Sequence, residues 1–127
     1  MVNELFFETI LSLLRGNVSV LVEAAFQHKL WDLVIPRVIE LARTSIIVCD
    51  SGSELSAQRH LDRGLDDPKR EFYHGDKRVA KFRETGTFEP GGEYVPPDYG
   101  VPTLTVSTID GYAPSLNEIV AFVKNAW

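Results

Sequence analysis

Cysteine is almost absent from this chain of 127 residues, because Cys49 is its single cysteine. An internal disulfide therefore cannot form. Small secreted domains usually depend on several disulfides, so a chain without an internal disulfide is not a secreted scaffold of that kind. The single cysteine fits a reducing compartment better. We accordingly expect a cytoplasmic protein, or one enclosed within a virion if it is an assembly component.

Long apolar runs are also missing. No stretch of about 18 apolar residues occurs, so the sequence predicts no transmembrane helix. The first residues, Met-Val-Asn-Glu, lack the basic start and the uninterrupted apolar segment of a signal peptide. We expect a soluble protein that does not interact with membranes.

Positive charge is in short supply. The chain has 13 Lys and Arg against 18 Asp and Glu, which gives a formal net charge of -5. Nucleic-acid binding needs concentrated positive charge because phosphate contacts dominate its affinity, so nucleic acid is not the expected partner. The apolar content of 44% is that of an ordinary globular chain. The length predicts one α+β domain spanning residues 1–127.

Three consecutive helical patterns fill the first third of the chain. Apolar residues recur at helical spacing over residues 3–15, 18–30 and 32–43. Asn3 and Asp32 are the expected N-caps, and Gly16-Asn17 is expected to end the first helix in a left-handed conformation. The β-prone run at 18–22 leaves a strand there as an alternative. Short connections predict a layer of antiparallel helices.

A small mixed sheet is expected after this helical layer. Its strands are predicted near residues 46–49, 70–74, 77–83 and 103–108. The first is a short apolar run typical of a central strand, and the last alternates apolar and hydroxyl side chains, as a half-buried strand does. Gly75-Asp76 predicts the turn of a hairpin that joins the middle two strands. A helix from Asp76 to Glu84 is the alternative.

The C-terminal segment carries the clearest helix signal. Ser115 and Glu118 have the spacing of a capping box, in which each side chain bonds a backbone N–H of the other residue. A helix is predicted over residues 116–126, packed across the sheet. Its expected buried residues are Ile119, Val120, Val123 and Trp127. These elements together predict an α+β fold.

Residues 45–64 predict a strand, a polar turn and a helix that ends at Gly64. A helix N-terminus offers free backbone N–H groups to an anion. The turn residues that could bind one are Ser51, Gly52 and Ser53. The turn lacks the motif of a P-loop and the Gly-x-Gly-x-x-Gly of a dinucleotide-binding fold. Simple helix capping is therefore the favoured interpretation.

Cys49 ends the predicted strand and is the candidate nucleophile of the chain. A catalytic cysteine needs a lowered pKa and a base within reach, for which His60 and His74 are the candidates. Asp50 follows directly and opposes a thiolate, and a buried cysteine often serves as a small hydrophobe. The histidines have no metal-site spacing, so neither a metal nor a cofactor is expected.

Two segments are candidate binding surfaces. The basic run over residues 69–83 is interleaved with aromatic side chains, which fits an acidic protein partner better than nucleic acid. A solvated surface is the simpler alternative. The Gly- and Pro-rich segment 85–102 predicts a docking loop, and its Pro-Pro-x-Tyr sequence matches the pattern that WW domains bind. The predicted partner-binding residues are Arg70, Tyr73, Lys77, Arg78, Lys81, Arg83, Tyr94, Pro96, Pro97 and Tyr99.

No convergent set of catalytic residues is present in the sequence. The expected function is therefore that of a non-enzymatic protein–protein interaction or assembly subunit, with a protein partner or self-association into an oligomer. A structural component of a phage particle or secretion-type machine is one such role, and a small inhibitor or immunity protein is another. The alternative is a small cysteine-dependent enzyme with Cys49 at a strand–helix junction.

Overall fold

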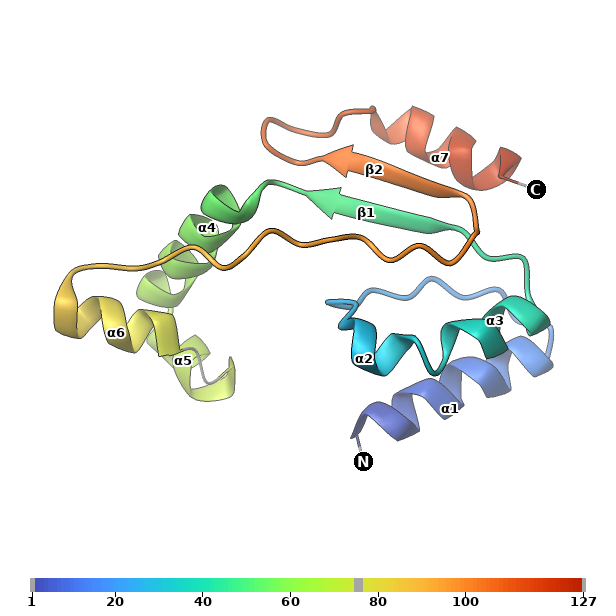
Figure 1. The fold of residues 1–127 in the computed structure, drawn as a ribbon, viewed down its shortest axis with the longest axis horizontal. Helices are drawn as coiled ribbons and strands as arrows, with labels where there is room; N and C mark the ends of the chain where they lie inside the picture. Colours follow the sequence, from blue (N-terminus) through green and yellow to red (C-terminus); the bar gives the residue numbers. More distant parts are fainter. Residues whose placement is uncertain (1, 75–76, 127) are drawn as a thin grey trace. The chain divides into compact units, whose positions relative to one another are not determined.

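The computed structural model describes residues 2–74 and 77–126, which form seven helices and two strands (Figure 1). The helices are α1 (Val2–Arg15), α2 (His28–Trp31), α3 (Ile35–Leu41), α4 (Ser53–Asp66), α5 (Pro68–His74), α6 (Lys77–Thr85) and α7 (Leu116–Asn125). The strands are β1 (Ile46–Asp50) and β2 (Thr103–Ser107).

The chain divides into two compact units, each made of segments that are distant in sequence. Unit 1 comprises Met1–Ile47, Pro97–Leu104 and Ile119–Trp127. Unit 2 comprises Val48–Pro96 and Thr105–Glu118. Cooperative folding of residues 1–127 as one domain stays a prediction.

The α+β class is confirmed, since helices precede a small sheet and a further helix follows it. The helices predicted over 3–15 and 116–126 correspond to α1 and α7, and the strands predicted near 46–49 and 103–108 correspond to β1 and β2. The two strands pair in parallel. Parallel pairing requires a long crossover, which the helical segment between them provides.

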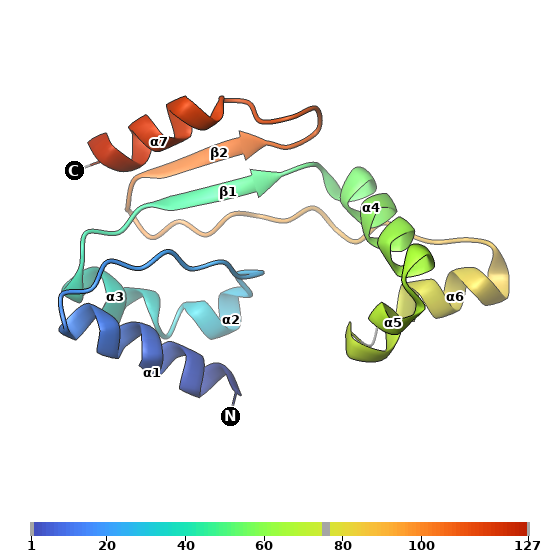
Figure 2. The ribbon, with the colours of Figure 1, turned by 180° about the vertical axis from the view of Figure 1, so that it is seen from behind.

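The predicted hairpin over residues 70–83 is wrong. The strands expected at 70–74 and 77–83 lie instead in the helices α5 and α6 (Figure 2), and the predicted turn lies outside the described residues. The start of α5 explains the error, because the backbone N–H of Lys69 donates to Asp67 Oδ1 over 3.0 Å. Aspartate before a proline at the first helical position is a helix-start signal. The alternative helix beginning at residue 76 matches α6.

The predicted second helix, over residues 18–30, is also wrong. Residues 18–27 belong to no helix or strand, and only His28–Trp31 is helical; the segment runs extended up to Phe26, whose φ of 29° breaks it. Side chains alternate between half-buried and exposed along this segment, with a period of two rather than 3.6. Its half-buried residues are Val20, Val22, Ala24 and Phe26. The β-branched valines favour an extended backbone, as the strand alternative anticipated.

Several helix ends differ from the prediction by a turn or less. The third helix begins at Ile35, so Asp32 is not its N-cap, and Pro36 in the first turn sets the start. Asn3 lies inside α1 rather than capping it. Asn17, with φ 58°, takes the left-handed conformation after α1. Helix α4 continues through Gly64 to Asp66.

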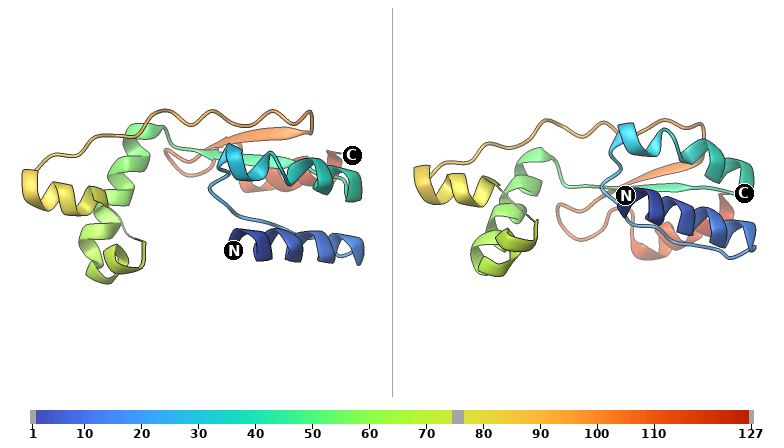
Figure 3. Two further views of the ribbon diagram at one scale, coloured as in Figure 1. Left: turned by 60° about the horizontal axis from the view of Figure 1, so that its bottom comes forward. Right: turned by 90° about the horizontal axis from the view of Figure 1, so that it is seen from below.

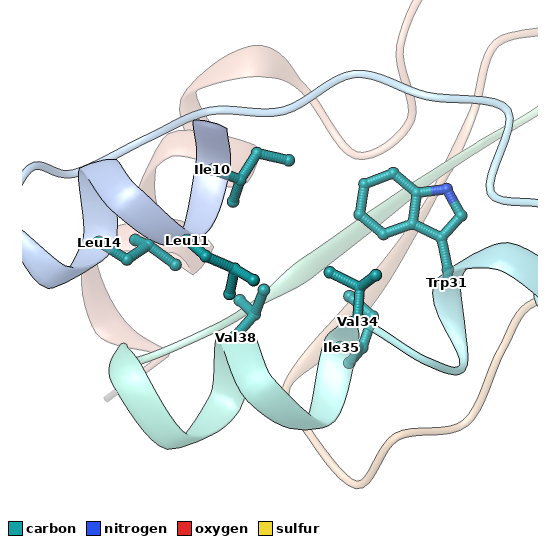
Figure 4. Packing of buried hydrophobic residues seen from close by; sticks show 7 residues of the cluster. All are labelled: Ile10, Leu11, Leu14, Trp31, Val34, Ile35 and Val38. Carbon is teal, nitrogen blue, oxygen red and sulfur yellow. The ribbon is translucent and has the colours of Figure 1, made fainter. Parts of the chain in front are cut away.

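The core of unit 1 forms where α1 packs against α3 (Figure 3). Its buried side chains, shown in Figure 4, are Ile10, Leu11, Leu14, Trp31, Val34, Ile35 and Val38. The Trp31 ring stacks on Phe26 with centroids 4.4 Å apart and an interplanar angle of 26°. This stacking holds the extended segment against the helices, because aromatic contacts add to the free energy of simple burial.

The helices of unit 2 pack around α4, which contacts both α5 and α6. Ala57 and Leu61 of α4 and Val79 of α6 are buried. Gly64 lies in van der Waals contact with Val79, and a Cβ atom at position 64 would collide with Val79 Cγ2. The absence of a side chain at Gly64 therefore permits the close approach of α4 and α6.

The capping box at the start of α7 is confirmed. The Ser115 hydroxyl and backbone N–H both donate to Glu118 Oε2, over 2.7 and 2.8 Å, and the Glu118 N–H donates to Ser115 Oγ over 3.4 Å. The predicted burial of Val120 and Val123 is wrong, because both are exposed. Trp127 lies outside the described residues.

The capping box makes a pH-dependent contribution to stability. Hydrogen bonds from the Ser115 hydroxyl and backbone N–H lower the pKa of Glu118 from its ordinary value of 4.5. Because the folded pKa lies below the unfolded one, the contribution is complete above pH 4.5. It is lost as the pH falls through the lower folded value.

Replacing Ser115 with alanine is expected to raise the Glu118 pKa toward its ordinary value, because the larger of the two hydrogen bonds that lower it is lost. A carbon-detected NMR titration of the Glu118 carboxyl group measures the change. Ser12→Ala, at an exposed position of α1, is the control and should leave the titration unchanged. An unaltered Glu118 pKa in Ser115→Ala would contradict the assignment.

Candidate functional site

The α5–α6 surface, defined by Lys69, Phe72, Tyr73, Lys77 and Lys81, presents aromatic side chains to solvent. Phe72 is 85% exposed and Tyr73 is 76% exposed. Their rings form an edge-to-face pair with centroids 5.4 Å apart and an interplanar angle of 83°. Large aromatic side chains that are exposed together, rather than singly, are typical of interaction surfaces.

Lysines accompany these aromatics. Lys69 precedes Phe72 and Tyr73 by three and four residues, so the three side chains share one face of α5. Lys77 and Lys81 are likewise one helical turn apart in α6. Among the described residues, neither Lys69 nor Lys77 has an ion-pair partner, whereas Lys81 Nζ lies 3.7 Å from Glu89 Oε2. The surface therefore keeps positive charge on Lys69 and Lys77 that no described residue neutralises through an ion pair.

The other predicted basic residues also lie on these two helices. Arg70 is half-buried in α5, and Arg78 and Arg83 are exposed on α6. The structure thus places the basic run on a helical surface rather than on a hairpin face. Sequence reasoning left Phe72 out of the binding set, although its position beside Tyr73 in a charged helix was a usable signal.

The loop between α6 and β2 contains the remaining predicted contact residues. Tyr94 and Pro96 are exposed, and partial burial raises the pKa of Tyr94 above its ordinary value. Pro97 is buried. The Tyr99 hydroxyl donates to Asp32 Oδ1 over 2.6 Å, and its ring packs on the core of unit 1. A WW domain would have to detach this tyrosine, so its recognition of Pro-Pro-x-Tyr stays only a prediction.

The strand–helix junction around Cys49 does not assemble a catalytic set in the described part of the chain. Cys49 is exposed there, and its thiol makes no hydrogen bond to a described residue. His60 lies half-buried in α4, and the side chain of His74 lies outside the described residues. The candidate base and nucleophile are therefore not brought together by any contact that the structure records.

In the predicted anion site at Ser51, Gly52 and Ser53, a side chain of the chain itself already accepts a backbone hydrogen bond. Gly52, with φ 76°, donates its backbone N–H to Asp50 Oδ1 over 2.8 Å. This carboxylate occupies the place that a bound anion would take, and its charge repels one. The described residues contain no group of three side chains arranged to hold a metal ion. None of the described helices has both the length and the apolar character to cross a membrane.

Unit 1 contains an apolar cavity of about 500 Å³ that the sequence did not predict. It is lined by residues of α1 and α3, by residues 17–22, by residues 41–47 between the end of α3 and the start of β1, and by Val123 of α7. Arg43 is the single charged residue among the described residues that line it. The alternating pattern at 18–26 was the sequence signal that could have indicated this arrangement.

Comparison with known proteins finds no relative, because no protein family, curated protein or solved structure matches the chain. Functional inference therefore rests on the chain's own surfaces.

Proposed function

We propose that the chain is a non-enzymatic protein–protein interaction or assembly subunit whose α5–α6 surface binds an acidic protein partner. The observation that carries the proposal is the exposed pair of Phe72 and Tyr73 beside Lys69. Exposed aromatics that desolvate on binding supply most of the affinity at protein interfaces, and surrounding charges select the partner and steer its approach.

An acidic protein fits this surface better than nucleic acid does. The chain has a net charge of -5, so a long polyanion that extends beyond α5 and α6 meets repulsion from the rest of the molecule. A compact acidic patch on a protein can engage Lys69 and Lys77 alone. The role suits a component of a phage particle or secretion-type machine, or an inhibitor or immunity protein, in the cytoplasm or a virion.

The alternative function, a cysteine-dependent enzyme, has less support. Nucleophilic catalysis needs a base within hydrogen-bonding distance of the thiol. Among the described residues Cys49 makes no such contact. A binding role requires no convergent set of catalytic residues, only a surface such as that of α5 and α6.

Binding of a fluorescent (Glu-Glu-Leu)n peptide tests the proposed function, because the peptide combines carboxylates with apolar side chains. Replacing both Phe72 and Tyr73 with alanine is expected to weaken binding by about tenfold or more, as for interface hot spots. Lys69→Ala combined with Lys77→Ala should weaken it and reduce its dependence on salt, since rim charges mainly act through long-range attraction. Fluorescence anisotropy at several salt concentrations measures both effects.

The matched control removes the same charge from unit 1. Lys29→Ala combined with Lys124→Ala alters two exposed lysines outside the α5–α6 surface and should leave binding close to that of the unmodified chain. Equal loss in both lysine pairs would mean that only net charge matters, which contradicts a defined surface. If the chain binds duplex DNA more tightly than the acidic peptide, the partner of this surface is a nucleic acid and the proposed acidic protein partner is wrong.

A further inference from the structure

Residues 19–25 of unit 1 form an extended segment that belongs to neither of the two described strands (Figure 1). Within the described part of the chain, the backbone N–H and C=O groups of residues 19–25 make no hydrogen bond. Alternate side chains of this segment nevertheless pack on the core, as in a strand that covers one. A row of unpaired backbone groups is a template for pairing with another strand.

The first part of β1 has an open edge as well. The backbone N–H of Ile46 donates to Pro102 O over 2.9 Å, and the Thr108 N–H donates to Asp50 O over 2.8 Å. In a parallel pair the hydrogen-bonding groups of successive residues point to opposite edges. Since Ile46 and Asp50 face β2, the N–H and C=O of Ile47 face away from it. No described strand lies on that edge.

Both open edges border the apolar cavity of unit 1. Residues 17–22 and residues 41–47 line the same space of about 500 Å³, a volume within the range of ligand and peptide sites. Its lining is mainly apolar, with Leu14, Val20 and Val38 among the contributing side chains. The side chain of Arg43 lies at the border and makes no hydrogen bond or ion pair to any described residue.

We propose that the cavity of unit 1 binds an extended peptide strand of a protein partner. The strand forms backbone hydrogen bonds with residues 19–25 and with the Ile47 edge of β1. Its alternate apolar side chains fill the cavity, and a carboxylate of the strand pairs with Arg43. This is β-strand addition, in which the backbone supplies affinity and side-chain pockets supply specificity. The inference rests on the proposed interaction role but uses a different unit and different residues.

The unpaired backbone distinguishes this occupant from an acyl chain. A fatty acid matches the apolar lining and the charge of Arg43, but it offers nothing to the N–H and C=O groups of residues 19–25. A peptide strand satisfies all three features together. Backbone groups that another strand can pair with are matched by a peptide and not by an acyl chain, so the peptide is the favoured occupant.

A pool of hexapeptides tests this inference. Each peptide has the form X-Thr-X-Thr-X-Asp, where X is Val, Ile or Leu, so that apolar side chains alternate and a carboxylate lies at one end. Fluorescence of Trp31, which lines the cavity, reports binding in the Trp127→Phe chain. NMR shifts of the backbone amides of residues 19–25 and Ile47 locate the bound peptide. N-methylation of alternate peptide nitrogens is expected to weaken binding by about tenfold, because it removes donors but keeps the side chains.

A second pool, X-Thr-X-Thr-X-Asn, lacks the terminal side-chain charge. Arg43→Gln should weaken binding of the Asp-ended peptides by about fivefold and leave binding of the Asn-ended peptides unaffected, as expected for a charge-assisted pair. Lys29→Gln removes a charge from unit 1 outside the cavity lining and is the matched control. Three results would each overturn the proposal. The first is no shift of the backbone amides at about 1 mM peptide, and the second is equal binding of the N-methylated and unmodified peptides. The third is a change in Trp31 fluorescence on adding decanoate but not on adding the peptides. If the chain binds the hexapeptides but not (Glu-Glu-Leu)n, the proposed function of the α5–α6 surface is wrong and the proposed peptide site of unit 1 is retained.

Discussion

Leu11→Ala is expected to lower the free energy of unfolding by about 2–5 kcal/mol, the range for truncating a leucine within a packed core. Leu11 has no exposed surface and lies between α1 and α3 in unit 1. Truncation removes apolar burial and leaves a cavity that two packed helices cannot close completely. The expected loss is a large fraction of the total stability of a small domain, which is about 5–15 kcal/mol.

Leu5→Ala is the matched control for this substitution. Leu5 lies in the same helix and is 73% exposed, so the change in helix propensity is identical while little burial is lost. Its effect should stay within about 0.5 kcal/mol. Both substitutions are made in the Trp127→Phe chain, so that Trp31 is its single tryptophan. Urea unfolding followed by Trp31 fluorescence and by far-UV circular dichroism measures both variants. Equal effects at positions 5 and 11 would contradict the assigned core.

Gly64→Ala is expected to destabilise unit 2 by about 1–2 kcal/mol, although alanine favours helices over glycine by about 1 kcal/mol. The new Cβ would collide with Cγ2 of Val79. Val79 is fully buried and, as a β-branched residue, cannot rotate its methyl groups away cheaply. The helices α4 and α6 must therefore move apart.

Two further variants isolate this steric effect. Gly92→Ala introduces the same Cβ where no atom lies within 4 Å, and its effect on the free energy of unfolding should be small. Val79→Ala removes the colliding methyl group, so it should cost less in the Gly64→Ala background than alone. A double-mutant cycle measures this coupling. A stabilised Gly64→Ala chain would show that helix propensity outweighs the contact.

The same two core substitutions test the prediction of a single domain. Leu11 lies in unit 1, and Gly64 lies in unit 2. If residues 1–127 unfold cooperatively, each substitution shifts one common transition seen by Trp31 fluorescence and by circular dichroism. If the units unfold separately, Gly64→Ala leaves the Trp31 transition unchanged.

Elements with strong short-range signals were predictable from the sequence. The apolar stripe of α1, the short apolar run of β1 and the alternation of β2 each depend on residues that are adjacent or one turn apart. The capping box at Ser115 and Glu118 is likewise a contact over three residues. Such local patterns determine an element whenever tertiary contacts agree with them.

Where two local patterns competed, the sequence did not decide. Residues 18–30 satisfied helical spacing and β propensity together, and packing against α1 and α3 selected the extended form. Residues 70–83 fitted a glycine turn and a helix, and burial of Val79 against α4 selected the helix. Tertiary contacts add several kilocalories per mole to one form, whereas propensities differ by less than about 1 kcal/mol per residue.

The candidate site was likewise predictable in part from the sequence and decided in part by tertiary contacts. Its ingredients were visible in the sequence as a basic run, interleaved aromatics and a Gly- and Pro-rich loop. Their exposure was not visible, because the Tyr99 hydroxyl donates to Asp32 and its ring packs on the core of unit 1, whereas Phe72 stays 85% exposed. That contact joins residues 67 positions apart.

The sequence by itself determined the α+β class, the positions of α1, β1, β2 and α7, and the absence of a disulfide framework. Only the tertiary structure decided that residues 19–25 make no backbone hydrogen bond to a described residue, that Arg43 borders an apolar cavity, and that Phe72 and Tyr73 face solvent. The physical reason is the sequence separation of the contacts that decide these features. Burial and backbone pairing depend on which distant segments meet, and no pattern within one segment contains that information.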